Sequence, residues 1–240
     1  MAVDTSPKPN GLKVALDTIV APKEAFESIS VTPRWVWAFI IAIVVGTLAT
    51  YLITPALQHA YPGTFAHQAA TDPRLAAMSE QNRQMAMTIG ERVVGFVWIG
   101  MIFGIPLILL FAAVVMLIFD KIGHGVGSFA KYWAAACNIA IPGLALASAL
   151  SAIIVYLRGV DSFATEQSVS LALPSLAWLA PNAGAKLAAF LGTVTPFSLW
   201  AVGLNVGAMR IIGKVSAVPA WLAALVMLLV PALFAAAGAK

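Results

Sequence analysis

Five stretches of this sequence contain no Asp, Glu, Lys or Arg, and they constrain the fold more than any other feature. They lie between Arg34 and Asp72, Arg92 and Asp120, Lys131 and Arg158, Lys186 and Arg210, and Lys214 and Lys240. The hydrocarbon core of a bilayer is about 30 Å thick and needs roughly 20 mostly apolar residues at 1.5 Å per residue. Each stretch is long enough, so the sequence predicts five membrane-spanning helices.

The composition also indicates that the chain lies in a membrane. The chain is 61% hydrophobic and 10% charged, with a mean hydropathy of +0.91, whereas a soluble domain has about 25% charged residues. Its net charge of +4 comes from Lys and Arg scattered singly between apolar runs, which is typical of the ends of membrane helices. A nucleic-acid-binding face would cluster them, so we expect no nucleic-acid partner.

The expected fold is an all-α polytopic membrane protein, a bundle of five transmembrane helices with an N-terminal amphipathic arm. Residues 1–33 are expected to form a cytoplasmic arm with a disordered leader and short helices, and residues 34–240 the transmembrane domain. The expected spans are about 35–53, 93–119, 132–157, 187–212 and 219–236.

The arm carries apolar residues at helical spacing. Leu12, Leu16 and Val20 recur every four residues, and Pro22 is suited to the first turn of a second helix with Phe26 on its apolar side. Two arrangements remain open for these helices. They lie along the membrane face, or they pack on the bundle of spans.

The connections between the spans alternate long, short, long, short. The first span is expected to close at Thr54-Pro55, and a helix over 73–91 is expected to run into the second span. Residues 171–181 are apolar but broken by Pro174 and Pro181, too short to span, and therefore interfacial or re-entrant.

The short connections are rich in Lys and Arg, whereas acids balance bases in the long ones. This positive-inside bias predicts a cytoplasmic N-terminus and, with five spans, a C-terminus outside. The expected location is the bacterial cytoplasmic (inner) membrane.

No ionisable residue lies in the middle of a span, which counts against a proton-coupled pump and against an intramembrane enzyme. We expect no catalytic residue, no cofactor and no metal site. Cys137 is the single cysteine, so one chain cannot form a disulfide, and Gly123-x-Gly125-x-Gly127 lacks the spacing and the preceding strand of a phosphate-binding loop.

Four spans contain an internal proline: Pro106, Pro142, Pro196 and Pro231. Such prolines occur in transporters with broken helices, and equally in ordinary membrane helices whose neighbours satisfy the freed carbonyls. Asn138 and Asn205, with Thr193, Thr195 and Ser198, form either a polar pocket or a set of interhelical hydrogen-bond partners.

Small residues recur at one-turn spacing in two spans. Gly100-x-x-x-Gly104 and Gly203-x-x-x-Gly207 allow a close approach of helices, within the chain or between chains. The residues expected to matter for packing are Pro22, Phe26, Gly100, Gly104, Pro106, Pro142, Pro196, Trp200, Gly203 and Gly207.

Three segments appear in an order and spacing that match a known family. They are Ala21-Pro22-Lys23-Glu24-Ala25-Phe26, Gly125-Val126-Gly127-Ser128-Phe129-Ala130-Lys131-Tyr132, and Pro196-Phe197-Ser198-Leu199-Trp200 followed by Gly203 and Gly207. With them the chain resembles bacterial members of the Yip family, the Ypt-interacting-protein (Yip-one type) domain of five-span membrane proteins. Thr195 stands where bacterial relatives often carry an aspartate.

This resemblance implies a cytoplasmic N-terminus, five helices and no enzymatic activity. Eukaryotic relatives bind small GTPases in vesicle traffic, but this chain lacks their long acidic or proline-rich arm, so that role is not transferred.

The leading hypothesis is a non-enzymatic integral protein that binds lipids, other membrane proteins or itself, an organiser or adaptor anchored by Phe26, Trp35 and Trp200. The alternative is a small-solute or lipid transporter that uses the proline-interrupted spans.

Overall fold

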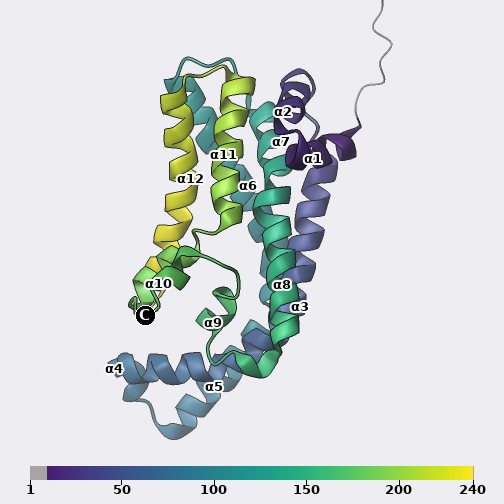
Figure 1. Cartoon of the computed structure of the whole chain (residues 1–240). Helices are drawn as coiled ribbons and strands as arrows, with labels where there is room; N and C mark the ends of the chain where they lie inside the picture. The colour runs from purple at the N-terminus through teal and green to yellow at the C-terminus, as the bar shows by residue number, and fades with distance from the viewer. Residues whose placement is uncertain (1–9, 240) are drawn as a thin grey trace, which may run out of the picture.

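The computed structural model describes residues 10–239, in which every regular element is a helix (Figure 1). The predicted disordered leader lies outside the described residues. Four helices are long and apolar enough to cross a membrane, and a bent pair of helices supplies a fifth crossing if it counts as one span. The all-α polytopic membrane fold is thereby confirmed.

The helices follow one another along the chain with short breaks. They are α1 Gly11–Val20, α2 Pro22–Val31, α3 Val36–Thr71, α4 Pro73–Ala76, α5 Glu80–Val94, α6 Val97–Ile122, α7 Phe129–Ala140, α8 Leu146–Arg158, α9 Glu166–Ser170, α10 Ala185–Gly192, α11 Pro196–Ala208 and α12 Ala217–Gly238. Two π-helical turns, η1 Ile141–Ala145 and η4 Met209–Gly213, continue α7 and α11, and two 3-10 turns, η2 Val160–Ser162 and η3 Leu176–Leu179, lie in the connections.

Figure 1 shows how these helices divide between the bundle and its two ends. The long helices α3, α6, α7–α8, α11 and α12 run side by side, and α1 and α2 lie at one end together with the two short connections. The opposite end carries α4, α5, α9, α10 and the C-terminus. We call these the arm end and the far end.

The helix of the first span does not end at Thr54-Pro55, since α3 continues through Pro55 and Pro62 to Thr71. A proline removes one helix hydrogen bond, and tertiary packing offsets that loss here. A hydrophobic cluster holds this part of α3 against α8 and α9. It contains Ala56, Ala60, Val155, Phe163, Val169 and Ala172.

The helix expected over 73–91 is divided in two. Asp72 caps α4, and the Ser79 hydroxyl accepts a hydrogen bond from the Asn82 amide at the start of α5. Gly95 and Phe96 then separate α5 from α6, and the expected start of the second span at Val93 lies in the last turn of α5.

The expected fourth span consists of two helices with a break between them, which the sequence interpretation missed. Its two helices, Ala185–Gly192 and Pro196–Gly213 with the π-helical turn included, bend by 53° at the break. Pro196 is therefore not an internal proline but the first residue of α11, where its missing amide hydrogen costs no hydrogen bond. Pro106 and Pro231 do lie inside α6 and α12, and Pro142 lies in the turn η1.

Candidate functional site

The arm packs on the bundle, the second of the two arrangements that the sequence left open. Val14, Phe26 and Ile29 are at most 1% exposed, and α2 contacts α7, α11 and η4. Phe26 lies over Gly207, where an added β-carbon would be 3.6 Å from the ring. Pro22 occupies the first turn of α2 as expected.

One side of α1 nevertheless stays uncovered. Leu12, Leu16 and Val20 are 43%, 56% and 79% exposed, and we call these three residues the α1 stripe. Near its beginning, an added β-carbon at Gly11 would lie 3.2 Å from Trp37 at the start of the first span. The stripe is therefore an apolar surface held next to the first membrane crossing.

The polar side of α1 holds an ion pair. The Lys13 ammonium lies 2.7 Å from the Asp17 carboxylate, and this hydrogen bond raises the pKa of Lys13. With an apolar stripe and a paired polar side, α1 has the pattern of a helix that lies in a membrane interface.

Aromatic rings gather near both ends of the membrane-crossing part. At the arm end, Trp133 contacts Trp35, Phe39 and Phe129 with ring centroids 5.7–6.4 Å apart. Toward the far end, Tyr51 meets Trp98 at 5.8 Å. The rise from Trp35 to Tyr51 is about 24 Å at 1.5 Å per residue, compared with about 30 Å for the hydrocarbon core of a bilayer.

A buried carboxylate lies where the two short connections meet, and it was not predicted. Asp120 is fully buried, and its Oδ1 accepts hydrogen bonds from the Tyr132 hydroxyl at 2.6 Å and the Gly127 amide at 3.3 Å. Its Oδ2 accepts no hydrogen bond but lies 3.1 Å from the Lys121 ammonium. The Val126 amide also donates to the Gly213 carbonyl at 2.9 Å, so the two loops are held together.

Glycines make room for this carboxylate. An added β-carbon at Gly125 or Gly213 would overlap Asp120, and one at Gly127 would overlap the Tyr132 ring. The glycine run that fails as a phosphate loop therefore has a packing role. Asp120, the only acid of the two short connections, was the signal in the sequence.

The two asparagines of the predicted polar pocket have different surroundings. Asn138 is fully buried and donates to the carbonyls of Arg34 at 2.8 Å and Ala134 at 2.7 Å, which ties α7 to the start of the first span. Asn205 instead lines a cavity of about 270 Å³ between α6, α7, α11 and α12, together with Thr193 and Ser198. Thr195 caps α11 by accepting a hydrogen bond from the Ser198 amide.

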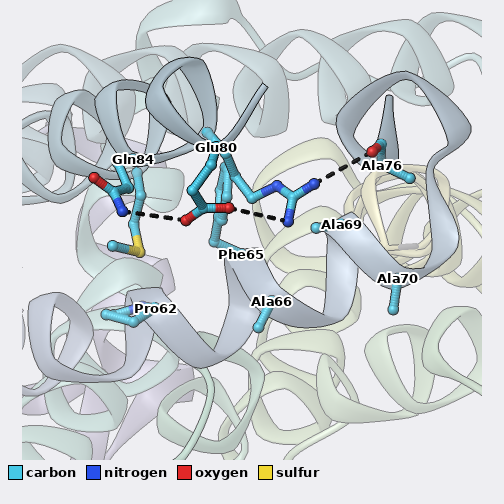
Figure 2. A pocket seen from close by; sticks show the side chains of 10 residues that line it. Pro62, Phe65, Ala66, Ala69, Ala70, Ala76, Glu80 and Gln84 are labelled. Atoms are coloured by element: carbon cyan, nitrogen blue, oxygen red, sulfur yellow. Dashed lines mark hydrogen bonds and ion pairs between the residues drawn. The ribbon is translucent and has the colours of Figure 1, made fainter. Parts of the chain in front are cut away.

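The far end contains two larger hollows. One, of about 480 Å³, lies between α3 and α5; in Figure 2 the Glu80 carboxylate pairs with Arg83 at 3.5 Å and accepts from Gln84 at 3.1 Å. Arg83 also donates to the Ala76 carbonyl, so its charged end is held in place. The other, of about 460 Å³, lies between α3, α9, α10 and α12 and shares Thr193 with the inner cavity.

The small faces differ in what they contact. An added β-carbon at Gly100, Gly104 or Gly203 would meet no atom of the described chain within 4 Å, in contrast to Gly207. Trp200 is 37% exposed on α11. Within residues 10–239, no group of three or more His, Cys, Asp or Glu side chains is placed to hold a metal ion.

One family model matches the chain, that of the Yip1 domain, over residues 16–239. The match includes the second half of α1 and every candidate crossing. No curated protein and no solved structure matches the chain.

Proposed function

The chain belongs to the Yip1 domain family, and on this premise we propose that it is a non-enzymatic membrane organiser or adaptor that binds membrane lipids through its arm end. It is a multi-pass membrane protein. The observation that carries the proposal is the α1 stripe, an apolar surface of Leu12, Leu16 and Val20 that the bundle leaves uncovered.

The fixed position of the arm supports this proposal. Val14, Phe26 and Ile29 are buried in the bundle and hold α1 in place. Binding of lipid to the stripe therefore does not have to order α1 first, which would cost conformational entropy. Fully burying a Leu or Val side chain contributes about 1.5–3 kcal/mol, so three partly exposed side chains favour immersion by several kcal/mol at most. The stripe lies close to Trp37 at the start of the first membrane crossing, and the partner available at that position in a membrane protein is lipid.

The non-enzymatic part of the proposal has its own support. Asp120 is the one fully buried carboxylate among the described residues, and its contacts hold the loop between α6 and α7 in place. It lines none of the three cavities described above. The proposed location is a bacterial inner membrane with the arm end in the cytoplasm, since the two short connections at that end have more Lys and Arg than acidic residues.

A depth measurement tests lipid contact directly. In a Cys137→Ala background, Leu16→Cys carries a nitroxide label in nanodiscs, and Lys13→Cys on the polar side of α1 is the matched control. We expect lipid-soluble oxygen to relax the label at position 16 and a water-soluble nickel complex to relax the label at position 13. Equal access of the nickel complex to both positions would refute immersion of the stripe.

A second measurement separates an adaptor from a transporter. Replacement of Leu12, Leu16 and Val20 by Ser is expected to remove lipids that co-purify with the wild-type protein, whereas the same replacement of exposed Leu107 on α6 is the control. The organiser function is wrong if the lipids stay bound and proteoliposomes instead show substrate flux, provided that this flux is abolished by substitutions at Asn138 or Asn205.

A further inference from the structure

The amide side chain of Asn205 has no hydrogen-bond partner among the described residues. Asn205 is 8% exposed and lines the cavity of about 270 Å³. In apolar surroundings an amide without a partner is costly, and the cost falls when a ligand group donates to it or accepts from it. This unpartnered group distinguishes the cavity from a simple packing defect.

The rest of the cavity wall is apolar until its other end. Leu109, Val202 and Met227 form part of the wall, and Ser198 and Thr193 lie at the end toward the break in the fourth span. Asn205 stands about 10 Å above Ser198 along α11 at 1.5 Å per residue. The cavity therefore has hydrogen-bonding groups at two ends and an apolar length between them.

The break between α10 and α11 lies where this cavity and the outer hollow adjoin. Thr193 lines both spaces, and the polar side chains that line the outer hollow of about 460 Å³ include Gln68, Gln167 and His67. No Asp, Glu, Lys or Arg lines either space in the described part of the chain. A charged ligand would lose its hydration there without a counter-charge.

We propose that the inner cavity is a binding site for an uncharged amphiphile of medium chain length, which reaches it from the far end past Thr193. Its hydroxyl or carbonyl group binds the Asn205 amide, and its apolar body lies along Leu109, Val202 and Met227. A volume of about 270 Å³ is near the lower limit of ligand pockets, which suits one short chain rather than a two-chain lipid. This site does not depend on lipid contact by the α1 stripe.

The test uses the full chain in nanodiscs and a photoreactive octanol that carries a diazirine. We expect mass spectrometry to place the label on α11 and α12 residues of the cavity, with competition by 1-octanol and little competition by octanoate. Asn205→Leu should reduce labelling about two- to tenfold, the effect of one hydrogen bond. Ala112→Leu, which fills the cavity from α6, should reduce it further.

The control is Thr47→Val, which removes an unpartnered hydroxyl from a groove on the outer side of α3 and α6. It should leave labelling of the cavity unchanged. Octanoate that competes as well as octanol would overturn the uncharged ligand class. Labelling spread over lipid-facing residues and unchanged in both Asn205→Leu and Ala112→Leu would overturn the site, provided that thermal unfolding shows both variants folded.

Discussion

Among single residues, Asp120 has the most demanding environment. A buried carboxylate loses several kcal/mol of hydration, and only close hydrogen bonds and a counter-charge offset the loss. Tyr132 near the start of α7, Gly127 in the loop and Lys121 at the end of α6 supply these contacts. The carboxylate therefore fixes how α6 and α7 meet at the arm end.

Removal of the Tyr132 hydroxyl tests this role. Tyr132→Phe leaves Oδ1 of Asp120 with one long hydrogen bond from Gly127, so we expect a loss of about 1–3 kcal/mol in the free energy of unfolding. Denaturant unfolding in detergent measures it. Tyr51→Phe is the control, because Tyr51 is exposed and contacts Trp98 through its ring; equal losses would contradict the role of Asp120.

Two glycines with opposite surroundings allow a matched comparison. Gly213→Ala places a methyl group onto the Tyr132 hydroxyl and Asp120, and such overpacking typically costs 1–3 kcal/mol. Gly100→Ala meets open space inside a helix and should stabilise by up to about 1 kcal/mol. Thermal unfolding of both variants measures the difference, and a lower midpoint for Gly100→Ala would show that its face is already occupied.

Glu166 provides a pH-dependent prediction at the far end. Burial raises the pKa of its carboxyl in the folded state, so the folded chain holds this proton to a higher pH than the unfolded chain. Its contribution to the free energy of unfolding therefore decreases as pH rises from the unfolded to the folded pKa. Glu166→Gln should raise the unfolding midpoint at pH 7 and lose this advantage near pH 4, whereas an equal gain at both values would exclude titration as the cause.

Among the helices, the broken fourth span depends on a local cap. Thr195 and Ser198 form a capping box in which each side chain accepts a hydrogen bond from the backbone amide of the other residue. Pro196 fits the first turn that follows. The break therefore has its own stabilising contacts, beside the cavity that Thr193 and Ser198 line.

Substitution of the cap distinguishes these contacts from general packing. Thr195→Ala should lower the free energy of unfolding by about 1 kcal/mol, whereas Thr195→Asp, another favoured cap residue, should keep most of it. Thermal unfolding in detergent gives both values, and Thr193→Ala is the control because its hydroxyl bonds to the Phe190 carbonyl within α10. An aspartate variant as unstable as the alanine variant would show that the hydroxyl is not acting as a cap.

The sequence predicted an all-α membrane fold but not where its helices break. Apolar composition reports the solvent around a segment, and it is the same for a straight span and for a pair bent by 53°. The capping signal Thr195-Pro196-Phe197-Ser198 was present but lay inside an uncharged stretch. The continuation of α3 beyond Pro55 could not be predicted from the sequence, because it depends on contacts with Phe163 and Val169, about 100 residues away.

The same reasoning explains which parts of the site could be predicted. Phe26 and Gly207 were expected to matter for packing, and they meet across about 180 residues. The separate surroundings of Asn138 and Asn205 follow from which face of each helix points inward, and composition cannot supply that. Asp120 was visible only as one acid at the end of a span.

In the molecule as a whole, the distribution of aromatic and basic residues makes the two ends of the bundle different. Trp35 and Trp133 mark the arm end, and Tyr51 and Trp98 mark the level of the opposite interface. The arm end also carries Lys and Arg residues of the arm and of both short connections, with Asp120 the only acid in those connections. Because Asp120 is buried and paired, it contributes little negative charge to that surface.

This asymmetry predicts the orientation. An odd number of crossings places the two termini on opposite faces, and positive residues are retained on the cytoplasmic side. A fluorescent protein fused before Met1 should therefore be bright, and alkaline phosphatase fused after Lys240 should be active, since it folds only outside the cytoplasm. Exchange of the two reporters is the control: the N-terminal phosphatase should be inactive and the C-terminal fluorescent protein dark. The reverse pattern would place the arm end outside, and the α1 stripe would then contact the outer leaflet instead of the inner one.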